Sequence, residues 1–317
     1  ESDEPIYMWF EEDEDAGDGT GTIYWYSDAD VVYLNEDSSF MFCYDMMNKY
    51  CSFHYLTDIR GLANINTSKV TNMQYMFSNC TGLSDISSLS NWDVSSVTDM
   101  SYMFYYCRSL SNISALSNWD VSSVEVMKAM FESCYILSDI SALCNWDVSS
   151  VEEMSGMFYV CESLSDISAI SNWDVSSVTN MSSMLADCRN LASIFSLSNW
   201  NVSNVTNMFD MFEGCTSLSD ISALSNWDVS SVTNMRGMFW FCTSLSNISA
   251  LSNWDVSSVT SMSSMFGYCA INDLSALSNW DVSSVTGMSD MFYNCRSLSN
   301  ISALSNWDVS SVTDMYT

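Results

Sequence analysis

Aspartates recur at a fixed spacing through most of this 317-residue chain. Each one follows an Asn-Trp pair, and successive positions are 27 residues apart with one step of 26. Carboxylates in such a series suit two kinds of chemistry: binding of Ca²⁺ between neighbours, or capping of the backbone N–H groups two and three residues further on. The aspartates are Asp93, Asp120, Asp147, Asp174, Asp228, Asp255, Asp281 and Asp308, and Asn201 occupies the remaining position.

Stacked carboxylates need something that offsets their repulsion. Two charges about 5 Å apart repel by roughly 1 kcal/mol in water. Either capping or a bound cation would supply the offset, and the two can coexist. A second column mixes aspartate with neutral residues, as expected of an exposed column without metal. Its members are Asp85, Asn112, Asp139, Asp166, Ser193, Asp220, Asn247, Asp273 and Asn300.

Cysteines follow the same spacing. We predict that they are small buried apolar residues, because parallel side chains in a stack of nine cannot all pair. Cys43 and Cys51 lie outside the column and are the disulfide candidate. The lone His54 offers neither a zinc site nor a catalytic base with a partner, so no enzyme activity and no cofactor other than Ca²⁺ are expected. The column is Cys80, Cys107, Cys134, Cys161, Cys188, Cys215, Cys242, Cys269 and Cys295.

These columns belong to a repeat that must position them. Valine, methionine, phenylalanine, leucine and tryptophan recur at the same step, which is typical of a solenoid whose turns bury apolar faces against each other. We predict about ten turns of 27 residues at 56–317, without an evident C-terminal cap, and an acidic, aromatic cap region with an irregular first turn at 1–55. Each turn should hold short parallel strands near "LSDIS" or "SSVTNM" and a tight helical turn around "MSYMFYYC".

The recurring string "WDVSSVT" followed by Met, Met-Phe, Cys and Leu resembles the BspA-like leucine-rich-repeat surface proteins, of the repeat type noted in mycoplasma lipoproteins. The resemblance covers the chain from about Leu56 to the C-terminus. It implies a leucine-rich-repeat-like fold and a secreted or surface-attached protein of adhesive or recognition type. It implies no enzymatic activity in the repeats.

The charge of the chain restricts its partners. A formal net charge of −31 disfavours nucleic acid and anionic lipid, because phosphates would be repelled. No apolar run approaches the roughly 20 residues of a membrane span, so no direct membrane insertion is expected. The chain begins at Glu1, which favours a processed protein at an extracellular or cell-surface location. The run "EEDEDAGDGT" is interpreted as a solvated segment, with a calcium loop as the alternative.

Positions beside the Met-to-Cys segment vary from turn to turn. Five of the seven basic residues after Leu56 lie there, together with many aromatic residues. Variable arginines and aromatics are typical of a recognition edge; the alternative is that they are tolerated surface positions. The basic residues are Arg108, Lys128, Arg189, Arg236 and Arg296, and the aromatics include Tyr102, Tyr105, Tyr106, Tyr135, Tyr159, Trp240, Phe241, Tyr268 and Tyr293.

Two functions fit this pattern. The first is a secreted structural or adhesive protein that polymerises head-to-tail into a filament, because the final repeat has the apolar columns of an inner turn. The second is a monomeric module that recognises an extracellular protein or glycan through the variable edge. Candidate glycosylation sites are Asn66, Asn79, Asn112, Asn180, Asn201, Asn204, Asn247 and Asn300.

Overall fold

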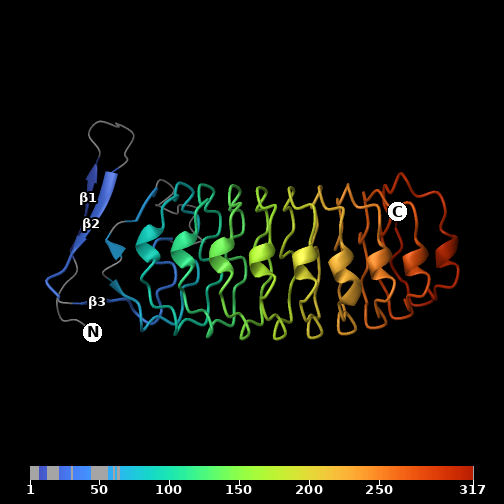
Figure 1. Cartoon of the computed structure of the whole chain (residues 1–317), viewed down its shortest axis with the longest axis horizontal. Helices are drawn as coiled ribbons and strands as arrows, with labels where there is room; N and C mark the ends of the chain where they lie inside the picture. Colours follow the sequence, from blue (N-terminus) through green and yellow to red (C-terminus); the bar gives the residue numbers. More distant parts are fainter. Residues whose placement is uncertain are drawn as a thin grey trace.

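The protein is seen in a computed structural model that describes residues 7–12, 21–29, 31–43, 56–59, 61–62 and 65–316. Figure 1 shows an elongated rod in which the repeats stack in sequence order. Each repeat packs against the one before and the one after it, so the architecture is solenoid-like. A two-stranded hairpin lies at the N-terminal end of the rod.

Regular secondary structure is short throughout the described residues. Strands β1 (Tyr7–Glu12) and β2 (Gly21–Tyr26) form the antiparallel hairpin, and β3 (Val32–Tyr33) pairs in parallel with β4 (Ile65–Asn66). Among the described residues, no helix is long and apolar enough to cross a membrane. The 3₁₀ helices are η2 (Ser87–Leu89), η3 (Ser114–Leu116), η4 (Ser141–Leu143), η5 (Ser168–Ile170), η6 (Phe195–Leu197), η7 (Ser222–Asn226), η8 (Ser249–Leu251), η9 (Ser275–Leu277) and η10 (Ser302–Leu304).

The predicted parallel strands are present as single bridged residues. A ladder with one residue per turn runs through the "SSVTNM" segment. Separate bridges join Asp58 to Asp85 and Ser193 to Asp220 in the segments equivalent to "LSDIS". The N–H of Thr98 donates to the carbonyl of Thr71 at 2.8 Å, and the N–H of Met100 donates to that of Val126 at 2.9 Å. The ladder is Asp37, Asn72, Asp99, Val126, Glu153, Asn180, Asn207, Asn234, Ser261, Gly287 and Asp314.

The predicted position of the helical turn was wrong. The 3₁₀ helix lies at Ser-Ala-Leu, whereas the Met-to-Cys segment forms consecutive turns. In that segment the N–H of Tyr102 donates to the carbonyl of Lys128 at 2.8 Å, and the N–H of Tyr106 donates to that of Glu132 at 2.7 Å. Because these N–H groups bond to the next repeat, they are not available for hydrogen bonds within a helix.

The core is a set of buried apolar columns that runs along the rod. Phe104 stacks between Phe77 and Phe131, with ring centroids 5.6 and 5.7 Å apart. Each tryptophan of the 27-residue column donates its indole N–H to a carbonyl of the previous turn, as Trp119 does to Leu89 at 3.0 Å. The predicted core role of these columns is confirmed by their burial.

Residues 31–43 lie against the first turn. The N–H of Leu34 donates to the carbonyl of Asn66 at 3.0 Å, and that of Phe40 donates to Gln74 at 2.9 Å. The ring of Phe42 stacks on Phe77 with centroids 5.0 Å apart. The inter-turn ladder and the phenylalanine column therefore extend to residues before position 56.

Candidate functional site

The aspartate column is held by local hydrogen bonds. In the turn of Asp228, one carboxylate oxygen accepts the N–H of Ser230 at 3.1 Å and its hydroxyl at 2.6 Å. Hydrogen bonds from Ser230 lower the pKa of Asp228. Asn201 accepts the N–H of Ser203 at 3.2 Å, so the amide performs the same capping. Every member from Asp93 to Asp308 accepts the N–H two residues further on, which confirms the capping interpretation for that N–H group.

Calcium binding by this column stays a prediction. In the part of the chain that the structure describes, no group of three or more His, Cys, Asp or Glu side chains is arranged to hold a metal ion. The alternative calcium loop at Asp13, Asp15 and Asp18 lies outside the described residues. Capping uses one carboxylate oxygen in each turn.

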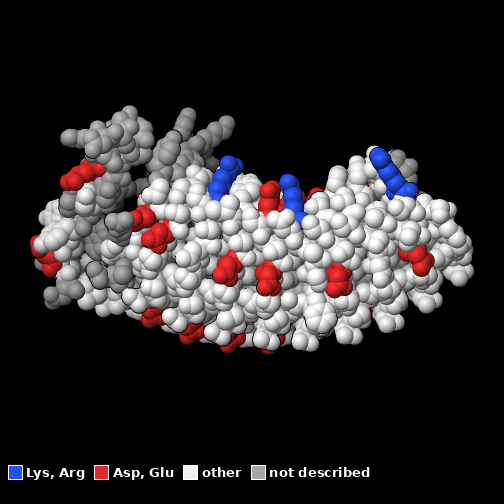
Figure 2. Space-filling view, turned by 45° about the horizontal axis from the view of Figure 1, so that its top comes forward, with Lys and Arg blue, Asp and Glu red and all other residues white. Residues whose placement is uncertain are grey.

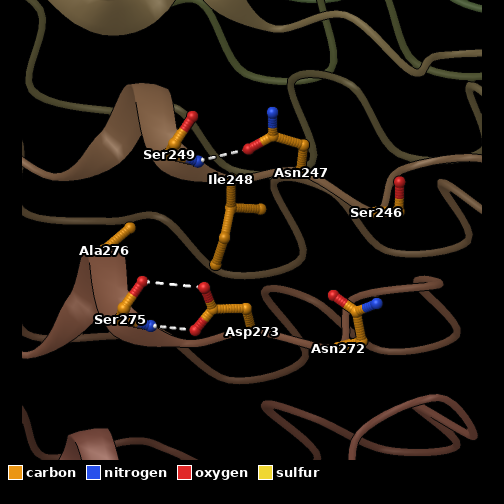
Figure 3. A pocket seen from close by; sticks show the side chains of 8 residues that line it. All are labelled: Ser246, Asn247, Ile248, Ser249, Asn272, Asp273, Ser275 and Ala276. Carbon is orange, nitrogen blue, oxygen red and sulfur yellow. Dashed lines mark hydrogen bonds between the residues drawn. The ribbon is translucent and has the colours of Figure 1, made fainter.

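The second column caps the start of each 3₁₀ helix. Asp273 accepts the N–H of Ser275 at 2.9 Å, and Asn247 accepts that of Ser249 at 2.9 Å (Figure 3). Two shallow depressions of about 290 and 280 Å³ lie between successive turns on this face. The first, drawn in Figure 3, is lined by Ser246, Asn247, Ile248, Ser249, Asn272, Asp273, Ser275 and Ala276.

The cysteine column is buried, as predicted. From Cys107 to Cys295, each thiol also donates to a carbonyl of the previous turn at 3.0–3.4 Å. Burial raises the pKa of the Cys107 and Cys242 thiols. Cys43 is buried, and both Cys51 and His54 lie outside the described residues, so the disulfide candidate stays a prediction.

The variable positions form one long edge of the rod, here called the variable edge: the Met-to-Cys segments of all turns together with the residue after each cysteine. In Figure 2 the visible Lys and Arg side chains stand along one edge, whereas acidic side chains also occur on the adjoining face and along the opposite edge. The structure therefore brings the predicted basic residues of different turns to one edge.

Two positions of each turn on this edge have left-handed backbone. Aromatic residues occupy several of them, including Tyr106 (φ 61°), Phe241 (φ 61°) and Tyr268 (φ 65°). Glycine adopts this conformation without the steric cost that a bulky side chain carries, yet it occupies only Gly156, Gly214 and Gly237 in these two columns. Small or polar residues such as Ser133 and Asp210 fill most of the other positions, so the aromatic residues are the large side chains that stand where the backbone alone would favour glycine.

The N-terminal part of the edge carries a tyrosine cluster with cations. The Arg108 guanidinium lies over the rings of Tyr106 and Tyr135, at 4.1 and 5.2 Å from their centroids. Tyr105 stacks on Tyr106 with centroids 5.8 Å apart. The Lys128 ammonium lies 5.8 Å from the ring centroid of Tyr102. At these distances each cation is attracted to the face of the tyrosine ring beside it.

Half-buried carboxylates, which were not predicted from the sequence, lie along the N-terminal and central parts of the edge. Burial raises the pKa of Glu132 and Glu213 to about 7 and that of Asp210 to about 6. Arg189 pairs with Glu162 at 3.3 Å and with Asp187 at 3.2 Å. The clue in the sequence was a glycine one turn later: a Cβ at Gly214 would overlap Asp187, and one at Gly237 would overlap Asp210.

The other predicted residues are distributed as follows. Arg236 lies 5.8 Å from the ring centroid of Phe209, and Arg296 donates to the side chain of Asn294 at 2.9 Å. Trp240 and Phe241 meet edge to face with centroids 5.5 Å apart. Of the glycosylation candidates, Asn66, Asn79 and Asn180 are half-buried; the exposed ones are Asn112, Asn201, Asn204, Asn247 and Asn300.

The fold and the variable edge define a protein built from stacked 27-residue repeats. Its sequence matches the family described as "Mycoplasma protein of unknown function, DUF285" over residues 44–142, 136–223 and 219–317. These three matches cover most of the chain, and the protein belongs to this family. A comparison with curated proteins gives no match.

Proposed function

We propose that this chain is an extracellular or cell-surface adhesion protein, without enzyme activity, that binds its partner through the variable edge. In this proposal the repeats are leucine-rich-repeat-like units whose rigid columns hold the edge in place. The edge presents Tyr, Trp, Ser, Gly and Arg, which are residue types enriched in binding loops and at interface hot spots.

One observation carries the proposal: aromatic side chains occupy left-handed positions of the edge. A non-glycine residue there costs of order 1 kcal/mol or more, and such outliers cluster at functional sites. The contacts that Phe241 and Tyr268 make with each other, with ring centroids 4.0 Å apart, offset part of this cost. Binding of a partner would explain why bulky aromatic side chains occupy these positions although they remain half-exposed.

The proposal is tested by binding to immobilised extracellular matrix proteins and polysaccharides. An edge variant with Tyr106→Ser, Trp240→Ser and Phe241→Ser should lose binding. A matched variant on the 3₁₀ face, Phe195→Ser, removes an aromatic ring that is 66% exposed and should bind normally. Equal binding by the two variants would contradict the proposal, and circular dichroism checks that both are folded.

Head-to-tail assembly is a second proposal. Ile301 and Met315 in the last described turn are 64% and 57% exposed, whereas Ile113 and Met100 at equivalent positions are buried. A further repeat and a second molecule would cover these residues equally, so their exposure does not distinguish the two. Light scattering and electron microscopy do: fibres support assembly, and a stable monomer contradicts it.

A further inference from the structure

One glycine of the variable edge provides space rather than backbone freedom. Gly267 lacks the left-handed conformation of Gly214 and Gly237. A Cβ at position 267 would overlap carbons Cε3 and Cζ3 of the Trp240 indole. The indole of one turn therefore lies across the backbone of the next, in space that only glycine leaves open.

This placement joins four rings into one surface. The Trp240 ring reaches Tyr293, two turns further on, with centroids 6.1 Å apart and planes at 21°. Beside them, Phe241 and Tyr268 stack at 4.0 Å and 14°. Phe241 and Tyr293 remain 39% and 44% exposed. We name Trp240, Phe241, Tyr268 and Tyr293 the aromatic platform.

Polar groups border the aromatic platform. The rings of Tyr268 and Tyr293 meet edge to face with centroids 5.3 Å apart, and Arg296 and Asp290 lie close enough to act electrostatically on Tyr268. Hydroxyl, guanidinium and carboxylate groups thus offer donors and acceptors around an apolar surface. A sugar ring has the complementary chemistry, with C–H groups on its faces and hydroxyls at its rim, and C–H groups are attracted to the negative face of an aromatic ring.

We infer that the aromatic platform is a binding site for a neutral saccharide, an inference that rests on the proposed function of the variable edge. The net charge of −31 and the nearby Asp290 disfavour an anionic glycan. A protein partner fits less well, because protein hot spots bury anchors in desolvated pockets.

The ligand of this inference is a saccharide chain rather than a single sugar. The tyrosine cluster around Tyr106 lies on the same edge, five turns before Phe241, since the equivalent positions between them are 133, 160, 187 and 214. At about 4.8 Å per turn, the two aromatic sites are separated by about 24 Å. One chain that reaches both would gain affinity through effective concentration.

The test measures binding of neutral oligosaccharides of graded length by titration calorimetry. For glucose, mannose and galactose chains, we expect affinity to rise by about 10²-fold once the extended chain exceeds about 24 Å. Trp240→Ala should weaken binding about tenfold. Gly267→Ala should do the same although it removes no ring, because the new Cβ displaces the indole.

The controls separate binding from folding. Phe195→Ala removes an exposed ring from the 3₁₀ face and should bind as the unaltered protein does. Gly267→Ala should keep the circular dichroism spectrum and the unfolding midpoint, because its backbone conformation suits alanine. If Gly267→Ala loses the spectrum of the folded protein, Trp240→Phe tests the placement of the ring instead. This variant keeps an aromatic ring with a shorter reach, and it should weaken binding of chains shorter and longer than about 24 Å.

Two results would overturn the inference: no binding of any neutral chain, or binding that Trp240→Ala and Gly267→Ala leave unchanged. If a protein partner still requires the variable edge, only the saccharide inference fails. If neither saccharide nor protein binding requires the edge, the proposed function fails as well. Affinity independent of chain length would contradict the two-site arrangement.

Discussion

The indole Nε1 of Trp173 donates a hydrogen bond of 3.1 Å to the carbonyl of Leu143, a residue of the preceding turn. The same relationship recurs along the rod, so each tryptophan ties its own turn to the one before it. The same carbonyl also accepts the backbone N–H of Trp146 at 3.2 Å, so removing the indole donor takes away one of its two hydrogen bonds.

Trp173→Phe should therefore lower the free energy of unfolding by about 0.5–1.5 kcal/mol for the lost hydrogen bond, with a further loss from the smaller ring. The measurement is urea unfolding followed by circular dichroism. Trp307→Phe is the matched control, since Trp307 lies in the last described turn and is only half-buried, although its indole also donates to a carbonyl of the turn before, that of Leu277, at 2.9 Å. An equal cost at both positions would contradict the account.

Stability should depend on pH through the half-buried carboxylates of the edge. Burial raises the pKa of Glu132 and Glu213 from 4.5 to about 7 and that of Asp210 from 3.8 to about 6. At a pH between the ordinary and the raised pKa of a carboxyl group, the folded chain holds a proton that the unfolded chain has released. The free energy of unfolding therefore falls as the pH rises from about 4 to 7. The unfolding midpoint should be higher at pH 5 than at pH 8.

The triple variant Glu132→Gln, Asp210→Asn and Glu213→Gln should flatten this dependence. The aspartate column acts in the opposite sense at lower pH: capping lowers the pKa of Asp147 and Asp228, so its contribution is lost as the pH falls below about 4. An unchanged slope between pH 5 and 8 in the triple variant would show that other groups cause it.

The aspartate column should tolerate asparagine better than alanine. Asp228→Asn keeps the oxygen that accepts the Ser230 N–H, as Asn201 already does, whereas Asp228→Ala loses the cap at a cost of about 1 kcal/mol. Urea unfolding compares the two variants. Repeating it with Ca²⁺ and with chelator tests the calcium prediction, since a calcium-bridged column would be stabilised by the ion and weakened by either change.

Thiol reagents should distinguish the two kinds of cysteine. Cys144 is exposed, whereas Cys134 and Cys161 are buried and their thiols donate to backbone carbonyls. Because the thiolate is the reactive form and burial raises the pKa of Cys134, the column should stay unmodified in the native protein. Peptide mapping after alkylation should find Cys144 modified first; early labelling of Cys161 would contradict the buried column.

The sequence was sufficient to predict the repeat, its buried columns and the capping aspartates, because each depends on the 27-residue period or on neighbours in the chain. It did not predict where the helical turn lies. The N–H groups of Tyr102 and Tyr106 bond to the next turn, and which turn a backbone group bonds to cannot be read from one repeat. The half-burial of Glu132 likewise depends on packing between turns.

The edge was predicted as a set of residues but not as a surface. The sequence places Gly267 one repeat after Trp240. Only the orientation of the Trp240 indole shows that a side chain at position 267 would overlap it. The raised pKa values at Glu213 and Asp210 come from burial among neighbouring turns, which no linear pattern displays.

Binding of a partner at the variable edge can be measured by hydroxyl-radical footprinting of the complex with any bound partner. We expect Tyr106, Phe241 and Tyr293 to become protected while Phe195, on the 3₁₀ face, stays as reactive as in the free protein. Protection of Phe195 with unchanged reactivity at the three edge residues would contradict the account.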